Sequence, residues 1–303
     1  MHPPIYPTAF NILTRPQTVF PMQISPHLSN VPPHNTRAPL YDFRHIDPAN
    51  LTLWTGFDYH TITSSELFRE LLQSPVKNPA VPNSPARNFL PNEATLRDHL
   101  SFVWIDINRT LDAVFAAERQ TPLTPPCATF LTNLTRIYTY TGEEFKRFLP
   151  DSQLLPDRIS LTAGASGEVR LVGDIKPSWN WNPQLLHHRN PAYLREFYQA
   201  ISQVYTYAQQ ARVRYFYILT DQCLVCFRRQ ANAASHPING GLEMSPPIYW
   251  ATQGPGRLTV ALALWFLNMH AAQDNGWQLR STAFDERGRR IALHPTFLHE
   301  YIY

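Results

Sequence analysis

The segment 155–179, LPDRISLTAGASGEVRLVGDIKPSW, constrains the fold more than any other part of the chain. Two strand-like runs flank a short stretch of small residues, which is the pattern of an antiparallel hairpin. If the hairpin folds about the centre of its turn, Asp157 lies opposite Asp174, because the numbers of paired residues have a constant sum. Lys176 points to the same side as Asp174, since side chains alternate along a strand. The sequence therefore predicts two carboxylates and one ammonium at the open end of the hairpin.

Such a group of side chains suits phosphodiester chemistry. Two neighbouring carboxylates can hold Mg²⁺, a hard cation that prefers oxygen ligands and retains several waters. The metal can lower the pKa of a bound water, and the lysine can orient that water and offset negative charge. The chain contains three lysines, Lys77, Lys146 and Lys176, and otherwise uses arginine, which does not readily exchange a proton. A surface hairpin with an ordinary Asp–Lys ion pair is the alternative interpretation.

The residues that follow predict a helix and a second pair of strands. Residues 192–212 have apolar side chains at helical spacing, and Gln199, Gln203 and Tyr207 recur at four-residue steps, which puts them on one face. A solvated helix surface is the alternative interpretation of that face. The runs YFYILT and CLVCFRR then indicate two strands around a turn. The expected order is hairpin, helix, strand, strand.

Together these motifs resemble the PD-(D/E)XK nuclease superfamily. Pro-Asp at 156–157 and Asp-Ile-Lys at 174–176 match its hairpin signature. Gln203 and Tyr207 match the Gln-x-x-x-Tyr motif of its RecB-like and λ-exonuclease-like branch. The runs YFYILTDQCLVCFRR, LEMSPPIYW and GRLTVALALWFLNMHA are also similar to the end of nuclease-like domains found in filamentous fungi. The resemblance covers about residues 101–271.

The resemblance implies an α/β (α+β) fold with a restriction-endonuclease-like core, in which helices flank a central mixed sheet in the order αβββαβ. It also implies a DNA nuclease that depends on Mg²⁺ or Mn²⁺. In such an enzyme Asp157 and Asp174 bind the metal and Lys176 positions the attacking water. Gln203 and Tyr207 then orient the site and the nucleic-acid strand.

Two points stay open at the level of sequence. Superfamily members commonly carry a further acidic residue on an early helix as a third metal ligand, and Glu118 and Glu144 are equal candidates for it. Many members keep the fold only to bind, so a catalytically inactive module for nucleic-acid or protein binding is the second hypothesis. The C-x-x-C formed by Cys223 and Cys226 indicates a third, a zinc or redox protein, although both cysteines fit better as small strand residues.

The pattern along the chain predicts two parts. Residues 1–92 are expected to form a proline-rich N-terminal arm and extension that is partly irregular, and residues 93–303 the nuclease-like domain. Within the second part, apolar periodicity predicts a long helix from residue 94 to about 120 and a second helical run over 128–140, extending toward residue 148. A helix that is apolar nearly all round, from about residue 258 to 272, is expected to be buried.

Composition bounds the partners and the compartment. A net charge of +3 over 303 residues is compatible with a polyanionic partner such as DNA but does not require one. Three cysteines without a disulfide framework favour a reducing compartment. The chain has no apolar run long enough for a membrane span and no secretory signal, so we expect an intracellular protein, nuclear or cytoplasmic, with no membrane partner.

Overall fold

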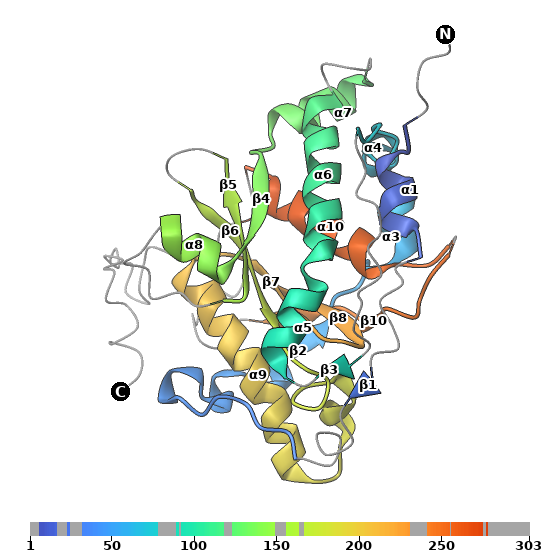
Figure 1. The fold of residues 1–303 in the computed structure, drawn as a ribbon. Helices are drawn as coiled ribbons and strands as arrows, with labels where there is room; N and C mark the ends of the chain where they lie inside the picture. The colour runs from blue at the N-terminus through green and yellow to red at the C-terminus, as the bar shows by residue number, and fades with distance from the viewer. Residues whose placement is uncertain are drawn as a thin grey trace, which may run out of the picture.

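The computed structural model describes residues 6–16, 23–24, 32–77, 89–90, 92–117, 123–148, 156–163, 167–230, 241–254, 256–274 and 277. Within these residues eight strands form one mixed sheet in the order β2-β9-β8-β7-β6-β5-β4, with β10 also paired to β8 (Figure 1). A separate parallel pair joins β1 (Gln23–Ile24) to β3 (Phe89–Leu90). The strands of the sheet are β2 (Leu51–Leu53), β4 (Ile137–Thr141), β5 (Arg158–Thr162), β6 (Val169–Ile175), β7 (Tyr215–Leu219), β8 (Cys223–Arg229), β9 (Leu242–Met244) and β10 (Ile248–Tyr249).

The central hairpin has the predicted register. Strands β5 and β6 pair antiparallel, with Arg158 opposite Gly173, and one irregularity lies nearer the turn. Continuing that register by one residue brings Asp157 opposite Asp174. Strand β6 also pairs in parallel with β7, so the chain must cross over the sheet between them.

Gly173 allows β6 and β7 to lie side by side. It is paired with Tyr217 of β7, whose ring is almost fully buried. A Cβ at position 173 would lie 2.0 Å from Cζ of that ring, so any larger residue would force the tyrosine or the strand to move.

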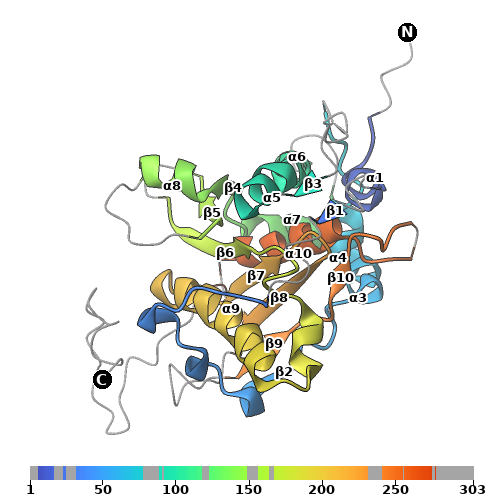
Figure 2. The same ribbon diagram turned by 60° about the horizontal axis from the view of Figure 1, so that its bottom comes forward.

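The crossover is helix α9 (Pro191–Gln210), which confirms the helix predicted over 192–212. The Asn190 side chain accepts a hydrogen bond from the Ala192 N–H, and Pro191 occupies the first turn, where an N–H has no helical partner. Helix α9 covers one face of the sheet, and α6 (Phe102–Ala117) and α10 (Val260–Ala272) cover the other (Figure 2). The fold is therefore mixed α/β with helices on both sides of the sheet.

The predicted long helix is divided into α5 (Glu93–Leu100) and α6 (Phe102–Ala117). The second helical run, predicted over 128–140 and extending toward 148, is correct only at its two ends. Helix α7 (Pro125–Thr132) ends early, the residues of β4 follow, and α8 (Gly142–Phe148) comes next. The β4 sequence IYTYT consists of β-branched and aromatic residues, which favour a strand, and every second residue at its start is buried.

Helix α10 (Val260–Ala272) is the buried helix that the sequence predicts, and it packs against α6 and the sheet. Both polar atoms of its buried Asn268 side chain form hydrogen bonds. Oδ1 accepts from Ser160 Oγ at 2.8 Å, and Nδ2 donates to the Leu264 carbonyl at 2.9 Å. Among the described residues, no helix combines the length and the apolar character needed to cross a membrane.

The described portions of residues 1–92 pack on the rest of the chain. Strand β2 extends the sheet beside β9, and α1 packs against α6 and α10. Buried residues such as Leu13 and Trp54 belong to the same hydrophobic core as the sheet. The remaining helical segments are α1 (Ala9–Thr14), η1 (Pro39–Tyr41), η2 (Phe43–His45), η3 (Pro48–Asn50), α3 (Tyr59–Ser64), α4 (Glu66–Leu71) and η4 (Pro183–His187).

Candidate active site

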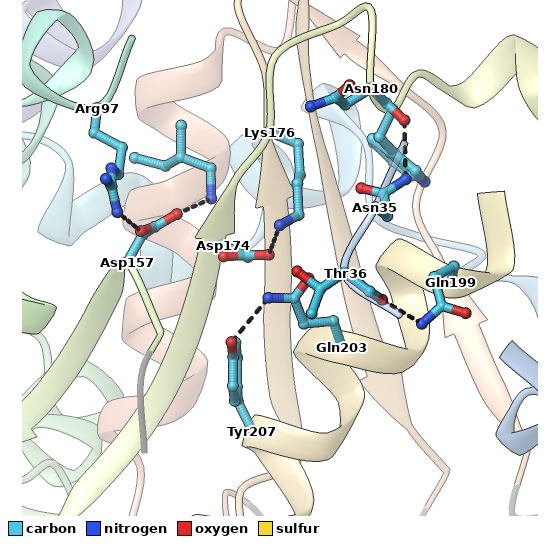
Figure 3. A network of polar contacts seen from close by, with 12 residues as sticks. Asn35, Thr36, Arg97, Asp157, Asp174, Lys176, Asn180, Gln199, Gln203 and Tyr207 are labelled. Carbon is cyan, nitrogen blue, oxygen red and sulfur yellow. Dashed lines mark hydrogen bonds and ion pairs between the residues drawn. The ribbon is translucent and has the colours of Figure 1, made fainter. Parts of the chain in front are cut away.

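Asp157 and Asp174 meet at the open end of the β5–β6 hairpin, as the predicted register requires (Figure 3). Asp157 Oδ2 accepts the backbone N–H of Ile175 at 2.9 Å, which ties the residue before β5 to the end of β6. The Asp157 carboxyl group is close enough to Asp174 to contribute to the raised pKa of that residue. The hairpin therefore brings together the two predicted acids.

Lys176 extends β6 by one residue, because its N–H donates to the Leu219 carbonyl of β7 at 2.9 Å. Its Nζ lies 2.9 Å from Asp174 Oδ2, and both side chains are buried. A buried ammonium is strongly unfavourable without such a partner. The predicted Asp–Lys pair is therefore an interior ion pair, which rules out the alternative of an ordinary surface pair.

Burial controls the protonation of this cluster. Removal from water is the main reason that the pKa of Asp174 rises to about 7; the Lys176 ammonium opposes the shift and Asp157 adds to it. For Lys176, removal from water alone would lower the pKa, but Asp174, Glu93 and Asp157 together raise it above the usual value. Lys176 therefore remains an ammonium at neutral pH, and Asp174 is the group that takes up or releases a proton.

Helix α5 adds two charged residues that the sequence analysis missed. Arg97 Nη1 donates to Asp157 Oδ1 at 2.7 Å. Glu93 lies one helical turn earlier and interacts electrostatically with Lys176, Asp157 and Arg97; burial raises its pKa. The sequence did carry a signal for this pair: Glu93 follows the N-cap Asn92 and stands four positions before Arg97, so both lie on one helix face. Glu93 is therefore an acidic residue of an early helix that acts electrostatically on the hairpin cluster.

Of the two glutamates predicted for that role, only Glu144 lies among the described residues, and it is engaged elsewhere. Glu144 forms a reciprocal cap at the start of α8: its Oε2 accepts from the Thr141 N–H at 2.7 Å, and its own N–H donates to Thr141 Oγ1 at 3.1 Å. This carboxylate is therefore engaged at the helix terminus. Glu118 lies outside the described residues.

Helix α9 presents Gln203 and Tyr207 toward the hairpin (Figure 3). Gln203 Nε2 donates to Tyr207 Oη at 2.9 Å, and Gln203 Oε1 is buried without a hydrogen-bond partner. Burial, followed by the nearby Asp174 carboxylate, raises the pKa of Tyr207, so its hydroxyl stays protonated. Gln199, on the same face, instead donates to the Thr36 carbonyl at 2.7 Å. The predicted polar face is thus an interior contact and not a solvated surface.

Two oxygen atoms at the cluster are buried without a satisfied hydrogen bond. Asp174 Oδ2 accepts no well-aligned hydrogen bond despite its closeness to Lys176, and Gln203 Oε1 accepts none. No group of three or more His, Cys, Asp or Glu side chains in the described ranges is arranged to hold a metal. The cluster therefore offers the carboxyl groups of Asp157 and Asp174, and one or two carboxylates are the protein ligands that Mg²⁺ commonly uses.

The C-x-x-C motif does not form a site. Cys223 and Cys226 are free and buried in β8, and residues three apart on a strand point to opposite faces. Burial raises the pKa of Cys223 to about 12 and that of Cys226 well above its usual value, so both remain thiols. These facts favour the interpretation of both cysteines as strand residues.

Comparison with known proteins adds nothing to this geometry, because no protein-family model, curated protein or solved structure matches the chain.

Proposed function

We propose that this chain is a metal-dependent phosphodiesterase that hydrolyses the backbone of DNA. The observation that carries the proposal is the convergence of Asp157, Asp174 and Lys176 at one end of the hairpin, with Gln203 turned toward them from α9. Two acids, one amine and one amide at one place can bind a metal, balance charge and orient a water, which are contributions that phosphodiester hydrolysis uses.

Each side chain has a role in this proposal. Asp157 and Asp174 would hold Mg²⁺ or Mn²⁺, which when bound supplies Lewis acidity toward the phosphate and a more acidic water. Lys176, held as an ammonium, orients the water and balances the charge that accumulates on the phosphate. Gln203 and Tyr207 fix the positions of these groups and of the nucleic-acid strand.

The test is a nuclease assay on DNA and RNA, single- and double-stranded, with Mg²⁺ or Mn²⁺. We expect metal-dependent cleavage by the wild type and none by Lys176→Ala or by the bulkier Lys176→Met. Lys146→Ala is the matched control, because Lys146 is exposed in the last turn of α8 and should be dispensable. Circular dichroism verifies that the variants fold. The enzyme proposal fails if the wild type cleaves no nucleic acid with either metal.

A catalytically inactive nuclease-fold module for nucleic-acid or protein binding is the second candidate. It is favoured by one observation: Lys176 and Arg97 already pair with the two acids, whose side chains are nearly buried. Calorimetric titration with Mn²⁺ separates the candidates. The enzyme gives a binding heat that is lost in Asp157→Asn or Asp174→Asn. An inactive module gives no such heat.

A further inference from the structure

Arg97 occupies an unusual position among the charges at the end of the hairpin. Three carboxylates, of Glu93, Asp157 and Asp174, lie near two cations, Arg97 and Lys176. Arg97 interacts electrostatically with all three acids and donates directly to Asp157. It therefore contributes the kind of positive charge that a metal ion would contribute at the same place.

The two cations differ in their freedom to move. The Lys176 side chain is only 6% exposed, whereas the Arg97 side chain is 42% exposed. Releasing Lys176 would leave a buried charge without a partner, which is strongly unfavourable, whereas a guanidinium at the surface can be rehydrated. Arg97 is thus the cation that can leave the cluster.

The contacts of Asp157 divide between its two oxygens. Oδ2 is held by the backbone N–H of Ile175, which does not depend on a side-chain rotamer. Oδ1 is held by Arg97 Nη1. A rotation of the Arg97 side chain would therefore free one oxygen while the carboxylate itself stayed in place.

We propose that Arg97 is a displaceable counter-ion: it occupies Asp157 Oδ1 in the metal-free protein and yields this oxygen to a divalent cation. This inference rests on the proposed function. After release the guanidinium remains on α5 at the edge of the site, where its planar fork matches two oxygens of a phosphodiester. Arg97 is thus a positioning residue that couples entry of the metal to capture of the substrate backbone.

The test is calorimetric titration of the full chain with Mn²⁺ for the wild type, Arg97→Gln, Arg97→Lys and Arg44→Gln. Arg97→Gln removes the competing cation and should bind Mn²⁺ about tenfold more tightly. Arg97→Lys keeps the charge and should stay close to the wild type. Arg44→Gln is the matched control, because it removes an exposed arginine that pairs with Asp42.

A second readout follows DNA. With Mn²⁺ saturating, Arg97→Gln should raise the apparent KM for DNA more than it lowers kcat, and it should reduce the salt dependence by about one phosphate contact. Arg44→Gln should change neither quantity.

The outcomes distinguish the two proposals. If the wild type binds Mn²⁺ and Arg97→Gln binds it no more tightly, the displacement proposal is overturned while the nuclease proposal stands. If neither protein binds Mn²⁺, both proposals fail. If Arg97→Gln alone binds measurably, Arg97 does not yield the oxygen in the wild type, and the displacement proposal is overturned.

Discussion

Replacing Asp174 with asparagine should remove a pH dependence of stability that this carboxyl imposes on the protein. Burial raises the pKa of Asp174 to about 7, from an ordinary value of 3.8 in the unfolded chain. Between these values the folded protein holds a proton that the unfolded chain has released. The contribution to stability is therefore complete below the unfolded pKa and is lost as the pH rises through the folded pKa.

The magnitude follows from the two pKa values. One pKa unit corresponds to about 1.4 kcal/mol, so the full span amounts to about 4 kcal/mol. Between pH 5.5 and 8.0, where the measurement is practical, the same relation gives a loss of about 2 kcal/mol in the free energy of unfolding. Lys176 does not contribute to this change, because its pKa is raised and it stays charged throughout.

The assay is urea unfolding of the wild type and Asp174→Asn at both pH values, with a chelator present to exclude metal. Comparing the two proteins is necessary because burial lowers the pKa of His270 to about 4, which makes stability increase with pH and partly masks the Asp174 effect. The His270 contribution is common to both proteins and cancels. Parallel pH profiles for the two proteins would show that Asp174 is not protonated in the folded state and would refute the reasoning.

Three further substitutions test contacts that hold the fold together. Gly173→Ala should destabilise the protein by about 3 kcal/mol or more, because the new methyl group overlaps the Tyr217 ring; a variant unfolding at wild-type urea concentration would contradict the close approach of β6 and β7. Leu111→Ala, at a fully buried position of α6, should cost about 2–5 kcal/mol in thermal unfolding, and a negligible loss would place α6 outside the core. Glu196→Gln removes the ion pair with Arg37 and weakens the acceptor of the hydrogen bond from the Asn35 N–H, so hydrogen exchange at that N–H should become faster. An unchanged exchange rate would show that the Glu196 carboxylate does not hold residue 35 in place.

Local rules account for the parts of the site that the sequence predicted. The pairing of Asp157 with Asp174 follows from the constant sum of paired positions in an antiparallel hairpin, and the common side of Asp174 and Lys176 from alternation along a strand. Gln203 and Tyr207 share a face because they are one helical turn apart, and their hydrogen bond agrees with that spacing.

Where the sequence-based prediction was wrong, competing local signals explain the error. The helical run predicted over 128–140 and toward 148 included IYTYT, yet these residues form β4 at the edge of the sheet. Its β-branched and aromatic residues favour a strand, and the neighbouring β5 supplies the hydrogen bonds that stabilise one there.

The amino-acid sequence by itself determined the hairpin, the crossover helix and the set of side chains that share one face of each element. These features depend on residues that are near one another along the chain. Tertiary structure alone decided that Glu93 and Arg97 lie beside Asp157, since 60 positions separate Arg97 from that acid. It also decided the protonation of Asp174, because a pKa near 7 requires the surrounding elements to exclude water from the carboxyl group. Periodicity in the sequence indicates which side chains share a face, whereas tertiary packing determines which faces meet and how completely water is excluded between them.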